Sequence, residues 1–302
     1  MDEREHRREQ LSDHQPIGGQ PNVHDPAHPG IGDPADERLT MPAGKVLLIV
    51  VIAVLIAAIF NADAMVRAGE TADACIVLEP STNKIFSSVR GAVWFRILCQ
   101  GKAGHSGRAG DTVSALGLAR KAMDLFETYH DDLLAASRGI PLFDKYENPM
   151  PITFGRCIAG DWPATAPARA VVEGVLGLLP NKTRHEVMDE MRAVLDQSGD
   201  QRLRERVTVE FMYRHDSHVL DPHHPLVEGL RQCCVDWELP VEIDALTASC
   251  DSWFYNNQLG IPTVVYGPGT LRYAHSNEEQ IALDDITNAA CVLTDFAAQW
   301  CQ

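Results

Sequence analysis

The residues of this sequence that could support chemistry are a small set of carboxylates and histidines. Asp73 and Glu79 bracket the apolar run 74–78, so both carboxylates are expected near the ends of a buried strand. A carboxylate in such a place is costly unless it is paired or bound to a metal. His275 lies in a Gly/Pro-rich loop after the expected strand 263–266, and α/β sheets bind ligands at the ends of their strands. One carboxylate and one imidazole are a beginning for a zinc site, which needs three or four ligands.

Each of these side chains also has an ordinary structural interpretation. Asp73 could cap a turn or a helix, Glu79 could form an ion pair at the rim of a sheet, and His275 could donate a hydrogen bond from its loop. For any one of them alone, the structural interpretation is favoured. The hypothesis of a metal site depends on their occurring together.

The elements that must position these residues follow from the spacing of apolar side chains. Segment 88–214 predicts the order β-α-β-β-α-β of a split βαβ unit. Thr183, with Glu186 three residues later, has the spacing of a capping box and should begin the second helix. The strands of this unit are expected at 89–100, 152–159, 168–179 and 207–214, and its helices at 112–130 and 183–196.

The segments that flank this unit predict an α/β domain with a mostly parallel sheet, because strands alternate with helices. The fold class is therefore α/β, an incomplete α/β/α domain formed by 41–87 and 215–302 with a ferredoxin-like βαββαβ unit inserted at 88–214. Residues 1–40 are rich in charge, His, Gly and Pro and are expected to be disordered. The strands of the α/β domain are expected at 46–52, 74–78, 241–245 and 263–266, and its helices at 225–237, 251–259 and 284–300.

The apolar run 46–60 has two interpretations. Its fifteen uninterrupted apolar residues fall short of the ~20 that a membrane-spanning helix needs. A fully buried parallel strand followed by a short helix gives the same continuous apolar pattern. The strand is favoured, and a membrane anchor through 46–60 is the alternative.

Composition narrows the class of protein. The net charge of −16 and the lack of a basic stripe argue against nucleic acid as a partner. The eight cysteines form no CxxC pair and match no structural zinc spacing, which is typical of free thiols in a reducing cytoplasm.

Five segments in register resemble the signatures of one family of zinc-dependent amidohydrolases. The family includes acetylornithine deacetylase, succinyl-diaminopimelate desuccinylase and the glutamate carboxypeptidases, and the resemblance runs from about Met41 to the C-terminus. It implies hydrolysis of an amide bond in a small, carboxylate-bearing N-acyl amino acid or peptide. The segments are ADACIVLEP (72–80), GKAGHSG (101–107), AGDWPATAPA (159–168), VEFMYR (209–214), and GIPTVVYGPG with AHSNE (260–278).

The resemblance also implies two zinc ions per subunit, bridged by an aspartate and a water, with a glutamate as general base. Asp73 matches a ligand of one zinc ion, and Glu79 is the alternative that some members use. His275 matches a ligand of the other zinc ion.

Four further residues match positions that contact the substrate in the family. His105 matches the histidine of the inserted lid, which reaches into the partner subunit's site and stabilises the developing oxyanion. Arg214 matches a position that holds a substrate carboxylate, and the backbone at Gly267 and Gly269 lines the same pocket. The lid asparagine that usually assists is replaced by Ala164. The resemblance thus predicts a homodimer or a mixed dimer formed through the lid.

The sequence departs from the family in its N-terminal third. Neither the His-x-Asp zinc motif nor the Asp-Met-Lys-Gly motif occurs there, and the segment 53–55, Ala-Val-Leu, falls where the general base and the next ligand belong. We therefore expect an inactive or impaired hydrolase, such as a truncated or frame-disrupted gene product. The alternatives are an active enzyme with a rebuilt metal site, a non-catalytic dimerising or regulatory subunit, and a membrane-anchored protein through 46–60.

Overall fold

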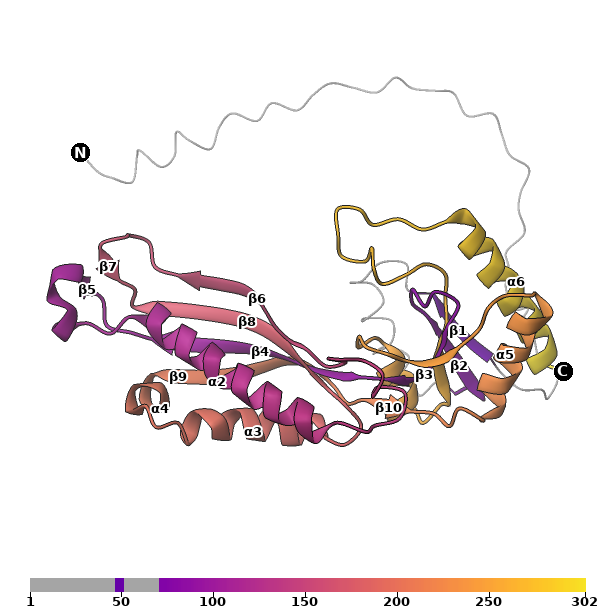
Figure 1. The fold of residues 1–302 in the computed structure, drawn as a ribbon, viewed down its shortest axis with the longest axis horizontal. Coiled ribbons are helices and arrows are strands. Elements are labelled where there is room, and N and C mark those ends of the chain that lie inside the picture. The colour runs from indigo at the N-terminus through magenta and orange to yellow at the C-terminus, as the bar shows by residue number, and fades with distance from the viewer. Residues whose placement is uncertain (1–46, 52–70) are drawn as a thin grey trace, which may run out of the picture. The chain divides into compact units, whose positions relative to one another are not determined.

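The structure of the protein is a computed structural model that describes residues 47–51 and 71–302 (Figure 1). The expected disorder of 1–40 and the second half of the apolar run, 52–60, lie outside these residues. The strand predicted at 46–52 is confirmed as β1 (Leu47–Val51), which pairs in parallel with β2 (Ala74–Leu78). Among the described residues, no helix is long and apolar enough to cross a membrane.

The first sheet has the order β1-β2-β12-β3-β10, with β11 also paired to β3. Strands β1, β2 and β12 run in parallel, while β3 is antiparallel to β12 and parallel to β11. The sheet is therefore mixed but mostly parallel, as predicted. The remaining elements of this part are β3 (Ile85–Val89), β10 (His218–Val219), β11 (Ile243–Leu246), β12 (Thr263–Val265), α5 (Pro225–Asp236) and α6 (Leu283–Trp300).

Strand β2 shows why its sequence is continuously apolar. Ala74 and Ile76 pack into the core formed with α5 and α6, whereas Cys75 and Val77 pack against the segment 250–261 on the other face. All four side chains are fully buried. A strand that is covered on both faces has no polar side to alternate with.

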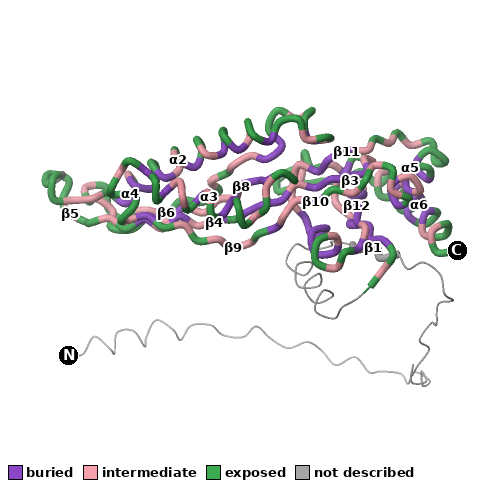
Figure 2. Tube along the Cα trace, turned by 90° about the horizontal axis from the view of Figure 1, so that it is seen from below, coloured by how far each residue is buried: buried purple, intermediate pink, exposed green. Residues whose placement is uncertain are grey.

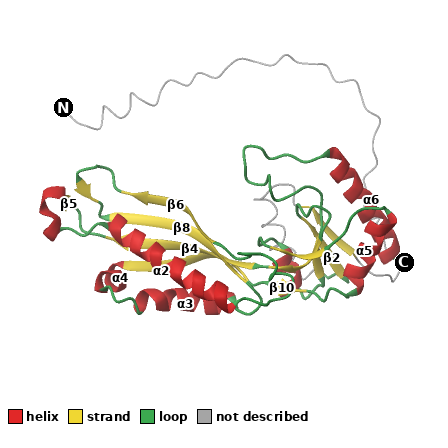
Figure 3. Ribbon diagram, viewed as in Figure 1, coloured by secondary structure: helices red, strands yellow, loops and turns green. Residues whose placement is uncertain are grey.

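The second sheet is antiparallel, with the order β6-β8-β4-β9, and helices α2 and α3 lie against one face (Figures 1 and 3). Phe95 and Ile97 of β4 and Phe126 of α2 are fully buried in the layer between them. Buried and exposed residues alternate along α2, as expected for an amphipathic helix (Figure 2). This part comprises β4 (Gly91–Gln100), β5 (Gly104–His105), α2 (Ala115–Ala136), β6 (Ile152–Ala159), β7 (Thr165–Ala166), β8 (Arg169–Leu178), α3 (Arg184–Asp196), α4 (Gln201–Arg206) and β9 (Val207–His215).

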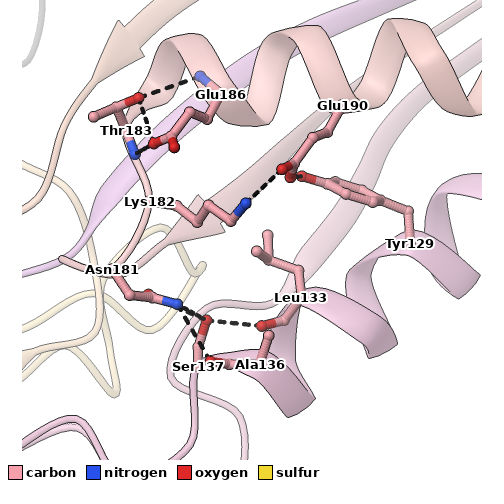
Figure 4. A network of polar contacts seen from close by, with 9 residues as sticks. All are labelled: Tyr129, Leu133, Ala136, Ser137, Asn181, Lys182, Thr183, Glu186 and Glu190. Atoms are coloured by element: carbon pink, nitrogen blue, oxygen red, sulfur yellow. Dashed lines mark hydrogen bonds and ion pairs between the residues drawn. The ribbon is translucent and has the colours of Figure 1, made fainter.

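The capping box predicted at the start of α3 is confirmed. The Thr183 hydroxyl accepts a hydrogen bond from the backbone N–H of Glu186 at 3.2 Å, and the Glu186 carboxylate accepts from the Thr183 N–H at 2.8 Å (Figure 4). One turn further on, Glu190 accepts hydrogen bonds from Tyr129 of α2 and from Lys182 (Figure 4). These contacts fix the start of α3 against α2.

Several elements go beyond the sequence-based expectation. Strand β3 is separate from β4, although the pattern suggested a single strand from residue 89, and the short elements β5, β7, β10 and α4 were not expected. The helix expected at 251–259 is present as a short π-helix, Phe254–Gln258. In β3, the buried Ser87 and Ser88 break the apolar pattern that marks a buried strand.

Candidate functional site

Glu79 follows β2 and Gly267 follows β12, so both lie at the same edge of the parallel part of the sheet. Ser81 joins the two loops, because its hydroxyl donates to the Gly267 carbonyl at 2.9 Å and accepts from the Gly267 N–H at 3.1 Å. The Thr82 N–H donates to the carbonyl of Gly269 at 2.7 Å. The structure thus brings Glu79, Gly267 and Gly269 together where α/β sheets bind ligands.

Glycine is required at two positions of this edge. A Cβ atom at Gly267 would lie 2.7 Å from the Glu79 carbonyl oxygen, which is closer than atoms can pack. Gly269 has a φ of +84°, a left-handed conformation that other residues rarely adopt.

Asp251 lies close enough to Glu79 to affect its ionisation. Burial, together with the negative charge of Asp251, raises the pKa of Glu79 to about 7. Burial also raises the pKa of Asp251, which is only 5% exposed. Burial and a nearby negative charge both disfavour the ionised form of a carboxyl group. This carboxylate pair, Glu79 with Asp251, is the most strongly perturbed acidic group of the candidate site.

A buried polar chain adjoins the carboxylate pair. Nε2 of His218 lies 2.9 Å from the Ser252 hydroxyl, which lies 3.1 Å from the Cys250 sulfur. Burial lowers the pKa of His218 to about 4 and raises the pKa of the Cys250 thiol, so both groups are neutral near pH 7. A neutral thiol is a poor nucleophile. We therefore assign these three hydrogen-bonded side chains a role in packing.

An aromatic stack borders the same region. The imidazole of His215 stacks on the Trp253 ring at 4.4 Å and contacts the Tyr213 ring at 3.9 Å. The guanidinium of Arg184 lies over the Trp253 ring, 4.8 Å from its centroid. Burial and the Arg184 charge lower the pKa of His215 to about 3. With this lowered pKa, the His215 ring is neutral at physiological pH.

The two acids predicted as alternative zinc ligands lie at opposite ends of β2. Asp73 precedes this five-residue strand and Glu79 follows it, a separation of six residues or about 20 Å at 3.3 Å per residue. Only Glu79 is therefore placed beside Gly267 and Asp251. His275 is exposed in the loop after β12 and has a left-handed φ of +58°.

The predicted zinc site is not assembled by these side chains. Among residues 47–51 and 71–302, no group of three or more His, Cys, Asp and Glu side chains is arranged to hold a metal ion. Glu79 and Asp251 provide two carboxylates, whereas a zinc ion in a protein takes three or four ligands. The described residues alone thus do not fit a zinc ion.

His105 and Arg214 occupy exposed positions on the lid. His105 is in β5, opposite Thr165 of β7, and its Nδ1 accepts a hydrogen bond from the Gly107 N–H at 3.1 Å. Arg214 is exposed near the end of β9. Strand β4 begins near the α/β sheet, spans ten residues and is therefore about 33 Å long. His105 follows the far end of this strand.

The sequence did not assign a role to Asp251, Tyr213 or His218. Tyr213 belongs to the VEFMYR segment, and the charges of Asp251 and Glu79 contribute to raising its pKa. The signal that could have marked Asp251 is an acid in an otherwise apolar stretch, 250–255. Its partner Glu79 is remote in the sequence, so spacing could not reveal the pair.

Comparison with known proteins matches residues 87–202 to the Peptidase dimerisation domain. The acetylornithine deacetylase of Edwardsiella ictaluri is 24% identical over 76% of this chain and 57% of its own length. A probable carboxypeptidase of Talaromyces marneffei is 26% identical over 70% of this chain and 45% of its length. The chain spans about half the length of these curated relatives.

Solved structures share the fold. The dipeptidase Dug1p of Saccharomyces cerevisiae superposes with a TM-score of 0.63 at 10% identity, over 80% of this chain and 62% of that one. The aminopeptidase PepT of Bacillus cereus gives a TM-score of 0.58 at 18% identity, over 78% of this chain and 60% of that one. At these identities the likeness concerns the fold alone.

Proposed function

We propose the function of this chain from its likeness to metal-dependent peptidases and deacylases that carry the peptidase dimerisation domain. We infer that it is a dimerising member of their family whose substrate class is small, carboxylate-bearing N-acyl amino acids or peptides. By itself, the 302-residue chain hydrolyses their amide bonds slowly or not at all.

The observation that carries this proposal is the carboxylate pair. Glu79 and Asp251 mark the strand end at which the family places its metals, yet two carboxylates are too few to hold zinc tightly. The N-terminal third of the sequence also lacks the His-x-Asp and Asp-Met-Lys-Gly motifs of the resemblance. A loosely held metal would not lower the pKa of a water molecule to near neutrality.

The test measures metal content and hydrolysis on the same preparation. The purified chain is equilibrated with zinc, passed through a desalting column, and analysed by elemental mass spectrometry, and hydrolysis of N-acetylornithine is followed in parallel. We expect less than one zinc ion per chain and a rate equal to that of buffer. Two zinc ions per chain, with hydrolysis lost in Glu79→Gln but kept in the exposed control Glu127→Gln, would overturn the proposal.

A second candidate function is that of a partner subunit in a mixed dimer. The position of His105 favours this function. His105 follows the C-terminal end of β4, whereas the carboxylate pair lies beyond the N-terminal end, so His105 cannot reach the carboxylate pair of its own chain. In the resemblance, the matching histidine completes the site of the partner subunit. The lid is also the part of the chain that matches the dimerisation domain.

Complementation tests this second function. The chain is co-expressed with an intact family member whose own lid histidine has been replaced by alanine. We expect mixed dimers with restored activity, and no restoration by the His105→Ala variant of this chain. A strictly monomeric chain, or equal restoration by His105→Ala, would exclude donation of His105 to a partner.

A further inference from the structure

The lid sheet has one face that no helix of the described residues covers. Side chains alternate along β4, so Phe95 and Ile97 face α2 and α3 while Trp94 and Arg96 face the other way. Trp94 is 47% exposed and lies opposite Val175 of β8 in the ladder. A single exposed apolar side chain is ordinary, so the surroundings of Trp94 decide whether this face can bind another molecule.

This open face is hollowed by a cavity of about 510 Å³, lined by residues of all four strands. The backbone explains the hollow. The ladder between β6 and β8 is irregular between Phe154 and Arg156, and the ladder between β4 and β9 is irregular beside Trp94. Gly155, which sits in the first irregularity, adds no side chain to fill the space. The volume lies within the range of small-molecule sites.

Two arginines and two glutamates meet at the hollow. Nε and Nη2 of Arg96 lie 2.8 and 2.7 Å from Oε1 of Glu173, and Nη1 of Arg156 donates to Oε2 at 2.8 Å. Two guanidinium groups thus share one carboxylate of the lining. The carboxylate of Glu210 also lies 3.9 Å from Nη1 of Arg96, so Arg96 is balanced by two acids, while Arg156 forms its ion pair with Glu173.

Glu173 holds the two arginines in fixed positions without using all their donors. A guanidinium group carries five N–H donors in a planar fork that matches a carboxylate. The Arg156 side chain is 61% exposed, so most of its donors face the solvent side of the cavity. This is the arrangement of a prepared anion site.

The opposite wall of the hollow is apolar. Trp94, Val175 and Met212 line it, and the Trp94 ring is held by the Tyr213 ring at 5.7 Å. A flat apolar group can pack against a tryptophan face at little entropic cost. None of the lining residues belongs to the carboxylate pair or to the loops around Gly267.

We propose that this hollow binds a small molecule with a flat apolar body and one carboxylate, with Trp94 holding the body and Arg156 the carboxylate. A second copy of the chain is the other occupant to consider. The volume of about 510 Å³ fits a small molecule, and the test below includes the second copy as one of its outcomes. The site does not depend on whether the chain hydrolyses amides.

The test uses phenylacetate as the probe and phenylacetamide as its uncharged match, with binding followed by ligand-detected NMR and calorimetry on the full chain. We expect a Kd on the order of 1 mM for phenylacetate. Binding should be at least fivefold weaker for phenylacetamide, and for Arg156→Gln and Trp94→Ala with phenylacetate. The control is Arg169→Gln, an exposed arginine near the start of β8, which should bind as the parent chain does.

Circular dichroism and the urea midpoint establish that each variant is folded. If Trp94→Ala unfolds, Arg156→Gln and the phenylacetamide comparison still decide the question. A Kd above 10 mM for the parent chain, or equal binding by Arg156→Gln, would overturn the proposal. So would a dimer that Trp94→Ala weakens and that leaves phenylacetate unbound, since the face would then be covered by a second copy.

Discussion

Tyr146 donates its phenolic hydrogen to the carboxylate of Asp244 at 2.7 Å, which joins the loop before β6 of the lid to β11 of the α/β sheet. Lys84 and Lys145 lie 2.7 and 2.8 Å from the same carboxylate, and the Ala245 N–H donates to it at 2.7 Å. The Asp244 side chain is fully buried, so its charge depends on these donors.

Replacing Asp244 should therefore be costly. Asp244→Asn leaves two ammonium groups facing a neutral amide, and we expect the free energy of unfolding to fall by about 2–4 kcal/mol. Tyr146→Phe removes one hydrogen bond and should cost about 1 kcal/mol. Urea unfolding measures both changes. The exposed Asp132→Asn on α2 is the control, and equal stability of Asp244→Asn and this control would contradict the prediction.

The two buried histidines should make the protein sensitive to acid. The folded state lowers the pKa of His215 to about 3 and of His218 to about 4, mainly through burial, whereas an unfolded histidine titrates near 6.5. Below pH 6.5 the unfolded chain thus binds more protons than the folded chain. Stability that is present above pH 6.5 is lost as the pH falls, by about 2–4 kcal/mol at pH 5 for the two groups together.

Urea titrations between pH 5 and pH 8 test this dependence. His218→Gln should reduce the slope below pH 6.5 by about half, since one of the two groups no longer titrates. His185→Gln, which changes an exposed histidine on α3, should leave the slope unchanged. Glu79, whose pKa is raised to about 7, opposes the histidines in this range, so the decisive comparison is between the variants and the parent chain. A His218→Gln slope equal to that of the parent chain would show that His218 is accessible to protons in the folded state.

Gly267 should tolerate no side chain. Gly267→Ala places a Cβ atom 2.7 Å from the Glu79 carbonyl oxygen, so the two loops must separate, at a cost of about 2 kcal/mol or more. Gly199→Ala is a matched control because its Cβ would meet no atom within 4 Å. Thermal unfolding compares the two variants. A Gly267→Ala variant as stable as Gly199→Ala would mean that the loops are not joined.

Removing the capping box of α3 should lower the stability of the protein by a moderate amount. Thr183→Ala removes the acceptor for the Glu186 N–H and should lower the free energy of unfolding by about 1 kcal/mol. Thr287→Ala changes a threonine inside α6, where the hydroxyl bonds the Leu283 carbonyl, and should cost less than about 0.5 kcal/mol. A cost for Thr183→Ala no larger than this control would contradict the capping role.

Local patterns predicted most of the fold because they reflect local physics. The Thr183–Glu186 box requires only a spacing of three residues, and the alternation along β4 directly reflects a sheet with one covered face. Strand β3 was not predicted, because Ser87 and Ser88 are buried but polar. A search for runs of apolar residues does not recognise a buried strand that contains them. The helix expected at 251–259 forms, but as a π-helix at Phe254–Gln258, and apolar spacing alone does not distinguish a π-helix from an α-helix.

The candidate site was less predictable because its members are far apart in the sequence. The sequence favoured Asp73 as a metal ligand, with Glu79 as the alternative, and the direction of β2 relative to β12 places only Glu79 beside Gly267. The pairing of Glu79 with Asp251 depends on how the segment 250–255 folds over the sheet. Spacing along one chain carries no information about such a contact.

The lid leaves and rejoins the α/β sheet at nearly one point, since Ala92 near the start of β4 lies opposite His215 at the end of β9. Opposed residues of an antiparallel pair have Cα atoms only about 5 Å apart. A tight turn could bridge that gap. The lid is thus inserted into the α/β domain at a single junction of the chain, the kind of place at which domain insertion is tolerated.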